Sequence, residues 1–153
     1  MGEKLSDYER ALKASEWRRK HPYEEFPDWA DLTGADLHGA DLHSEDLVRA
    51  HLRRANLSGA NLVGANFKMA DLHSANLSGA NLRKASLYEA ILYGANLKDV
   101  DLSEADLRWA GLREANLYGA NLWEADLYGT DLTGVDLGEW ERGPNGFTRT
   151  KKP

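Results

Sequence analysis

The feature that most constrains this chain is a leucine that recurs at every fifth residue. From Leu32 to Leu137 the series has a single exception, Phe67, and it defines 22 consecutive five-residue units over residues 30–139. Short sequence repeats of constant period are typical of solenoids, in which each unit buries its apolar side against its neighbours. The repeat therefore predicts the architecture before any other signal is considered.

Each unit has five positions, which we name small, polar, central, first turn and second turn. The leucine is central, the small position is Ala in 18 of 22 units, and the polar position is Asp or Asn in 18 of 22. The two turn positions vary, although Gly fills the second of them nine times. Bulky residues there, such as Arg49, Met69 and Trp109, indicate that a positive φ is not compulsory, which favours type I-like turns in many units.

A period of five excludes both common regular structures. Five steps along an α-helix advance about 140°, so the leucines would spread around the whole helix. In a continuous strand an odd period would place successive leucines on opposite faces. A short extended segment followed by a bend solves the problem, because the small and central residues then share one side and the polar residue faces the other. We expect a solenoid with leucine and alanine inside and with Asp or Asn side chains that bond turn amides.

This pattern resembles the pentapeptide-repeat family. The family motif A(D/N)LXX appears here as Ala35-Asp36-Leu37-His38-Gly39 and as Ala60-Asn61-Leu62-Val63-Gly64, and the resemblance covers about 110 of 153 residues. It implies an all-β fold, a right-handed quadrilateral β-helix with four units in each coil. The 22 units would then make about 5.5 coils.

Residues 1–29 do not follow the repeat, and we expect them to form an N-terminal capping segment with a short helix. Ser6 and Glu9 form a predicted capping box at the start of a helix over Asp7–Lys20, which His21-Pro22 would end. The competing interpretation is a helix that binds a partner. The apolar residues expected to close the first coil are Leu5, Tyr8, Leu12, Trp17, Phe26 and Trp29.

Residues 140–153 are predicted to form a C-terminal cap and a basic tail. Trp140 and Phe147 are candidates to cover the last coil, Gly143-Pro144-Asn145-Gly146 has the composition of a turn, and Arg149–Pro153 reads as a frayed tail. Some members of the family dimerise through a C-terminal helix. No such helix is predicted here, so we expect a monomer or a weak dimer.

With four units in each coil, residues twenty apart would stack in columns. One column of polar positions contains four asparagines in succession, which predicts a ladder of side-chain amides along the rod; it reads Asp36, Asn56, Asn76, Asn96, Asn116, Asp136. The neighbouring column places His51 between two carboxylates, and we interpret it as a surface imidazole in preference to a metal or acid–base site; it reads Asp31, His51, Asp71, Ile91, Gly111, Asp131.

Glu45 is the most discordant inward residue, because it stands where most units have alanine. A buried carboxylate without a partner is unfavourable. We expect either a local distortion or a pairing of Glu45 with Arg49 or with a residue of the N-terminal cap.

The composition narrows the functional class. The chain has no Cys, which excludes disulfides and thiolate metal sites, and it has no apolar run of membrane-spanning length. No nucleophile, phosphate-binding or metal motif is found. We therefore expect a cytoplasmic protein that is not an enzyme, needs no cofactor, and binds neither nucleic acid nor membrane directly.

The exposed positions are unevenly occupied. Basic residues lie in the earlier coils, and aromatic residues gather in the later ones. Tyr and Trp are enriched at protein interfaces, although Tyr is also well tolerated on any β surface. The candidate interaction surface consists of Tyr88, Tyr93, Trp109, Tyr118, Trp123 and Tyr128.

Two functional hypotheses follow. The first is a rigid scaffold that binds another protein. The second comes from the resemblance, since some pentapeptide-repeat proteins are similar to duplex DNA, bind DNA gyrase or topoisomerase IV, and protect against quinolone-type or peptide inhibitors. Residues 30–139 carry 17 acidic and nine basic residues, a net charge of −8. A rod of about 5.5 coils, spaced by about 4.8 Å, would be about 26 Å long. A DNA duplex of that length would carry roughly 15 charges, so the lower charge of the repeat favours the scaffold.

Overall fold

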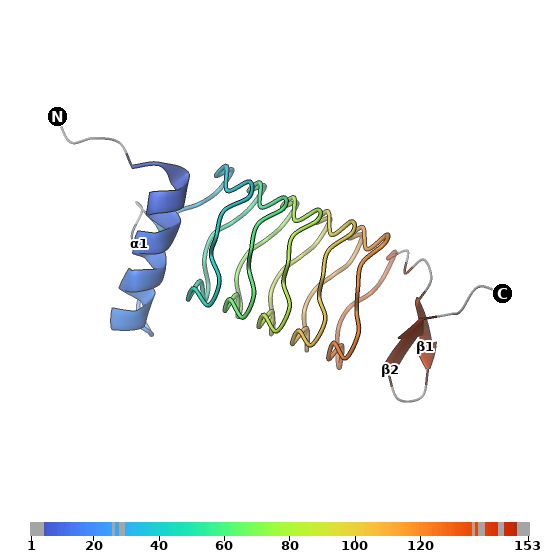
Figure 1. Ribbon diagram of the computed structural model, residues 1–153. Helices are drawn as coiled ribbons and strands as arrows, with labels where there is room; N and C mark the ends of the chain where they lie inside the picture. The colour runs from blue at the N-terminus through green and yellow to red at the C-terminus, as the bar shows by residue number, and fades with distance from the viewer. Residues whose placement is uncertain are drawn as a thin grey trace.

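The described residues of the protein form one helix, a stack of coils and a hairpin (Figure 1). Helix α1 (Asp7–Lys20) lies across the first coil, and strands β1 (Trp140–Gly143) and β2 (Gly146–Arg149) form the hairpin at the opposite end. The structure is a computed structural model. It describes residues 5–25, 27, 30–135, 137, 140–143 and 146–149, the last two ranges beyond Trp140 by their backbone alone.

Each coil contains twenty residues and four turns. Isolated parallel bridges join polar positions that are twenty residues apart, from Asp36 with Asn56 to Gly111 with Asp131. The central amide of one coil donates to the polar carbonyl of the next, as in Leu37 N to Asn56 O at 2.7 Å. The polar amide of the upper coil donates back to a small residue below, as in Asn56 N to Ala35 O at 2.8 Å. The predicted stacking of residues twenty apart is therefore confirmed.

The core is the column of central side chains. Every central residue from Leu32 to Leu122 is at most 2% exposed, and Phe67 fits among them with no exposed surface. Burying a side chain of this size contributes about 1.5–3 kcal/mol. The alanines that lie between the leucines are also buried in most units, so the interior is filled from every side of the coil.

The expected type I-like turns are wrong. At the second turn position, twelve non-glycine residues and nine glycines all have φ between 55° and 74°, which is the signature of type II turns. In this geometry the middle peptide of each turn from Gly34 to Glu114 bonds to the turn above it, as in Arg49 N to Lys68 O and Trp109 N to Tyr128 O, both 2.9 Å. This ladder compensates for the left-handed backbone, which costs about 1–2 kcal/mol at a residue with a Cβ.

The polar side chains serve the turns, as predicted. Most accept a hydrogen bond from the amide two residues later, as Asp31 Oδ1 does from Thr33 N at 2.8 Å. The asparagine ladder is also present: Asn76 Nδ2 donates to Asn56 Oδ1 at 3.3 Å, and Asn96 Nδ2 donates to Asn76 Oδ1 at 3.1 Å. Each amide thus bonds within its own turn and between coils.

Helix α1 begins and ends where the sequence predicts. The Ser6 hydroxyl accepts from Glu9 N at 3.2 Å, and the Glu9 carboxylate accepts from Ser6 N at 2.9 Å, so the capping box is complete. The Glu9 carboxylate also accepts from Ser6 Oγ at 2.9 Å, and its bonds from the Ser6 amide and hydroxyl hold the pKa of Glu9 below its ordinary value. His21 follows the last helical residue and its amide bonds back to the carbonyls of Trp17 and Arg18.

Helix α1 supplies hydrogen-bond partners for backbone groups of the first coil, which has no coil below it to bond to. At the polar position of each of its four units, one backbone carbonyl or amide bonds to a side chain of α1. Two carbonyls accept from side chains of α1, Asp31 O from Arg10 at 2.8 Å and Asp41 O from Tyr8 at 3.2 Å. Two amides donate to side chains of α1, Asp36 N to Asp7 at 2.7 Å and Asp46 N to Ser15 at 2.7 Å. Through these four bonds helix α1 covers one end of the stack of coils.

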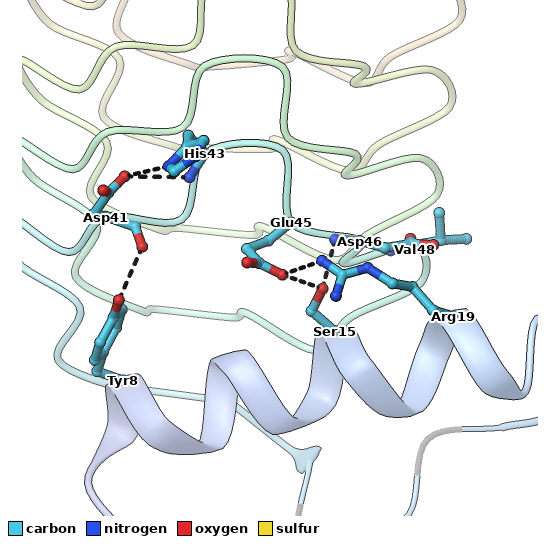
Figure 2. A network of polar contacts seen from close by, with 8 residues as sticks. All are labelled: Tyr8, Ser15, Arg19, Asp41, His43, Glu45, Asp46 and Val48. Atoms are coloured by element: carbon cyan, nitrogen blue, oxygen red, sulfur yellow. Dashed lines mark hydrogen bonds and ion pairs between the residues drawn. The ribbon is translucent and has the colours of Figure 1, made fainter.

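Glu45 is one of the anchors of this cap (Figure 2). Its Oε2 accepts from Ser15 Oγ at 2.5 Å and pairs with Arg19 at 2.6 Å. The predicted pairing with a cap residue is therefore confirmed, and the partner is not Arg49. The carboxylate replaces the alanine because the helix supplies its donors.

The side chains that seal the coil differ in part from those predicted. Ala11 and Ala14 are fully buried and Leu12 packs against the core, whereas Tyr8 is 40% exposed and Trp17 stacks on His21 with ring centroids 4.6 Å apart. Small residues at this interface let the helix backbone approach closely enough for its polar side chains to reach the coil. Phe26 and Trp29, which were also predicted to seal the coil, lie outside the described residues.

At the other end, Trp140 acts as predicted. It packs against the core, and its Nε1 donates to Ala120 O at 2.8 Å, in place of an amide from a further coil. The hairpin was not predicted: β1 pairs with β2 in antiparallel register, with Gly143 opposite Gly146, so Arg149 belongs to a strand and not to a tail. Asp136, the Phe147 side chain, the turn residues Pro144 and Asn145, and residues 150–153 lie outside the described part.

The positive φ of the turns can be tested with two glycines. Gly79 has φ +64°, Gly111 does not have positive φ, and an added Cβ would meet nothing within 4 Å at either position. We expect Gly79→Ala to lower the free energy of unfolding by about 1 kcal/mol and Gly111→Ala to leave it unchanged or raise it by about 0.4–1 kcal/mol. Urea unfolding measures both, and equal effects would show that the turn geometry carries no penalty.

The cap predicts a coupling between Ser15 and Glu45. Ser15→Ala removes the acceptor of Asp46 N and the donor to Glu45, so we expect a loss of about 1–3 kcal/mol in unfolding free energy. The loss should be smaller when Glu45 is already Ala, as a double-mutant cycle would show. Ser78→Ala, which removes only a surface bond to Asn76, serves as the control. A loss no larger than this control would contradict the anchoring role.

Candidate interaction surface

The six aromatic residues of the predicted interaction surface all lie outside the core, but their side chains are exposed to different extents. Tyr128, Trp123, Tyr118 and Trp109 are 69%, 64%, 61% and 53% exposed. Tyr93 is 36% exposed and Tyr88 is partly buried. All but Trp109 occupy the first turn position, where the side chain leaves the bend. The structure therefore presents four largely exposed aromatic rings in its last coils.

Tyr88 lies within a column of alternating cations and rings. Lys68 Nζ is 4.8 Å from the centroid of the Tyr88 ring, and Arg108 Cζ is 5.4 Å from the same centroid. These distances lie within the range of cation–π attraction. Tyr128 follows Arg108 in the same column, twenty residues further on. The ring of Tyr88 is thus held between two cations and is not available as an isolated contact.

Arg108 is fixed by two carboxylates. Its Nε and one terminal nitrogen each bond to Asp106 at 2.8 Å, and Asp126 lies 3.7 Å from Nε. The bond and charge of Asp106 raise the pKa of Arg108, and the Arg108 bonds lower the pKa of Asp106. The bidentate geometry orients the guanidinium group over Tyr88.

Trp109 and Tyr128 form one exposed pair. Their rings meet edge to face with centroids 5.4 Å apart, a favourable aromatic arrangement. The Trp109 ring covers Gly129, since a Cβ on that glycine would lie 2.5–2.8 Å from ring atoms. The missing side chain at Gly129 thus lets the indole lie flat on the next coil.

Tyr93 belongs to a different network on the adjoining face. Its ring stacks on His73 with centroids 5.0 Å apart, and its hydroxyl donates to Glu114 at 2.8 Å. The hydrogen bond to Glu114 is the main reason that the pKa of Tyr93 is raised. Tyr93 therefore links three successive coils, a role in the surface of the rod itself.

The register groups the aromatic residues in two ways. Tyr118, Trp123 and Tyr128 occupy successive units of one coil and so lie on three faces of the rod. Tyr88, Trp109 and Tyr128 lie in successive coils and share one face, a grouping that was not predicted. Whether these rings bind a partner stays a prediction.

Most of the basic side chains of the repeat are paired with acidic ones. Arg83 and Lys84 both reach Glu104, at 2.7 and 3.4 Å, and the Arg83 bond lowers the pKa of Glu104. Further pairs join Arg53 to Asp71, Lys98 to Asp99 and Arg113 to Glu114. Exposed pairs of this kind stabilise little, but they neutralise acidic charge locally along the rod.

The histidines do not gather into a metal site. Among the described residues no group of three or more metal-ligating side chains is found. His38 contacts Ser58 at 3.0 Å, and His43 contacts Asp41 at 2.9 Å on another face. The carboxylates beside His51 have other partners: Asp31 bonds to Thr33 and Asp71 pairs with Arg53.

The sequence reasoning missed a set of turns without side-chain caps. Four units have no Asp or Asn at the polar position, namely those with His51, Ser86, Ile91 and Gly111. In these units no side chain of the described residues accepts from the first-turn amide. Ile91 and Gly111 stack directly on each other. The signal was available, because both residues depart from the repeat in the same column.

The comparison with protein families agrees with the repeat. The model described as pentapeptide repeats, in eight copies, matches residues 30–68, 70–108 and 101–139. The chain belongs to the pentapeptide-repeat family. No match is found among curated proteins. In the described part of this family member, no helix is both long and apolar enough to cross a membrane.

Solved structures of other pentapeptide repeat proteins are similar to it. One from Nostoc is 34% identical, with 69% of this chain and 82% of that chain covered and a TM-score of 0.42. One from the thylakoid lumen of Arabidopsis thaliana is 28% identical, with 68% and 66% covered and a TM-score of 0.38. The plasmid-mediated fluoroquinolone resistance protein QnrB1 is 26% identical, with 72% and 63% covered and a TM-score of 0.37. The chain thus spans less than two thirds of the last two.

The contact between Trp109 and Gly129 gives a testable prediction. Gly129→Ala combines a positive φ of 72° with displacement of the indole, so it should destabilise the protein more than Gly79→Ala does. In a Trp109→Ala background the penalty should fall to that of the left-handed backbone alone, about 1–2 kcal/mol. Urea unfolding and near-UV circular dichroism of the indole measure the two effects. An unchanged penalty in both backgrounds would contradict the packing.

Proposed function

We propose that this protein is a non-catalytic rod, with the right-handed, four-sided coil that the family implies, and that it acts as a rigid scaffold for a protein partner in the cytoplasm. The main supporting observation is that Trp109, Tyr118, Trp123 and Tyr128 are each more than half exposed in the last coils. Large aromatic side chains provide much of the binding energy at protein interfaces.

The rigidity of the rod supports the same function. The carbonyls of Tyr118, Trp123 and Tyr128 each accept a bond from a turn amide of the coil below, and the amide of Trp109 donates to Tyr128 O. These bonds hold the backbone beneath the four rings, so little backbone conformational entropy remains to be lost on binding. The polar side chains of the repeat cap turns or form ion pairs. We therefore assign no catalytic step and no cofactor to the protein.

The alternative is a mimic of duplex DNA that binds a type II topoisomerase. Residues 30–139 are acidic, as a mimic requires, but their net charge of −8 is about half of the roughly 15 charges on a duplex of the same length. The ion pairs of the turns oppose it, since six of the nine basic residues in this range neutralise neighbouring carboxylates; they are Arg53, Arg83, Lys84, Lys98, Arg108 and Arg113. The scaffold is the better supported of the two.

The scaffold is tested by replacing Trp109, Tyr118 and Trp123 together with Ser. We expect the partner recovered from the native cell extract to be lost while the far-UV circular dichroism is unchanged, because the three rings lie outside the core. A control with Val48, Val63 and Met69 replaced by Ser changes outward apolar residues of earlier coils and should keep the partner. Retention of the partner by the first variant would show that the aromatic surface does not bind it.

The mimic is tested in a gyrase supercoiling assay with and without a quinolone. Inhibition of supercoiling or protection from the quinolone would favour the mimic over the scaffold. The absence of any effect at micromolar protein would exclude it.

A further inference from the structure

We propose that the vacant polar position at Gly111 is a docking site for an Asn or Gln side chain of the protein partner, with the exposed side chains of Ile91 and Trp109 beside it. This inference rests on the proposed scaffold function and specifies where and by what chemistry the partner binds. The site lies on the face that adjoins the Trp109–Tyr128 pair.

The first supporting observation is a gap in an otherwise occupied column. Ile91, Gly111 and Asp131 are bridged in succession, so the glycine lies between two side chains of neighbouring coils. A Cβ added at Gly111 would meet nothing within 4 Å. Gly111 does not have positive φ, so the backbone there does not require glycine. The absence of a side chain is therefore not explained by the fold.

The second observation is a backbone donor that the gap leaves available. At every described polar position that holds Asp or Asn, the side chain accepts from the first-turn amide. Asn96 accepts from Lys98 N at 3.2 Å, and Asp131 accepts from Thr133 N at 3.0 Å. Gly111 has no such group, and within the described part of the chain no acceptor bonds to Arg113 N. A hydrogen-bond acceptor from a partner, placed beside Gly111, would occupy the position that the Asp or Asn side-chain oxygen has in most other units.

The chemistry of the neighbours favours a carboxamide over a carboxylate. Thr133 N and Thr133 Oγ1 both donate to Asp131 Oδ1, which leaves Oδ2 available to accept a further bond. These bonds lower the pKa of Asp131, so it stays ionised and repels a second carboxylate. A carboxamide oxygen can accept from Arg113 N while its nitrogen donates to Asp131. In the asparagine ladder an amide likewise accepts within one turn and donates to another coil, although there the nitrogen donates to the coil below.

The third observation is the apolar surface beside the gap. Ile91 is 48% exposed at a position that the repeat normally gives to Asp or Asn, and Trp109 is 53% exposed two residues before Gly111. An exposed Ile and Trp beside an unoccupied polar position match a partner segment with an apolar residue next to its Asn or Gln. Buried polar contacts flanked by apolar ones are typical of interface centres.

Two substitutions test the site without threatening the fold, because each restores the repeat. Gly111→Asn fills the gap with the chain's own carboxamide, and Ile91→Asn replaces the apolar wall. Both variants should unfold at the same or higher urea concentration than the parent. His51→Asn restores the repeat in the same column three coils away from Gly111 and is the matched control.

The probe is a displayed library of random peptides, depleted on the Gly111→Asn protein and then selected on the parent. We expect the enriched peptides to carry Asn or Gln beside an apolar residue. They should bind Gly111→Asn and Ile91→Asn about tenfold or more weakly than the parent, since one buried hydrogen bond or its flanking contact is lost. Binding to His51→Asn should be unchanged. A lack of enrichment, enriched peptides without a carboxamide, or equal binding to Gly111→Asn would each overturn the site.

The cellular partner separates this inference from the scaffold itself. If the partner is lost from both the triple aromatic variant and Gly111→Asn, both proposals hold. If it is lost only from the aromatic variant, the scaffold stands and the Gly111 site is wrong. If neither variant loses it, both are wrong.

Discussion

The structure depends on the hydrogen bonds that join one coil to the next at a spacing of twenty residues. Each central amide from Leu32 to Leu112 and each second-turn amide from Gly34 to Glu114 bonds to a carbonyl in the coil above, and each polar amide from Asn56 to Asp131 bonds to the coil below. These bonds hold the leucines in one column and fix which side chains share a face. A solenoid of this kind is stabilised by contacts between neighbours, so every surface property follows from the same register.

The repeat predicted the core and the register well because both follow from local stereochemistry. A leucine every five residues can converge on one axis only if the chain bends in each unit, and the asparagine column then follows. The turn type was not predictable in the same way. When each unit is considered alone, bulky residues such as Arg49 and Trp109 indicate a negative φ. The positive φ becomes favourable through bonds to the next coil, in which the amides of Arg49 and Trp109 donate to Lys68 O and Tyr128 O.

The ends show the same limit. The capping box of Ser6 and Glu9 lies within four residues and was predictable, whereas the contact of Ser15 with Glu45 joins residues thirty apart. The sequence marked Glu45 as discordant but offered several partners. The terminal hairpin was missed because its two short strands lack the alternating apolar pattern that signals a sheet.

The sequence alone shows which aromatic residues make up the candidate surface, but it does not show which of them contact one another. The Tyr and Trp residues are evident in the sequence, but only the register shows that Tyr88 lies between Lys68 and Arg108, or that Trp109 meets Tyr128. Gly111 and Ile91 were visible as departures from the repeat. The proposal of a docking site at these residues required two structural observations, the open space at Gly111 and the available amide of Arg113.

The four turns of each coil also govern how such a protein can change its length during evolution. Duplication of twenty residues would add one layer and return every later side chain to its original face. Duplication of a single unit would rotate everything beyond it by a quarter turn, so Trp109 and Gly111 would point in a new direction relative to helix α1. Natural variation in length should therefore reorient the candidate interaction surface unless it proceeds by whole layers.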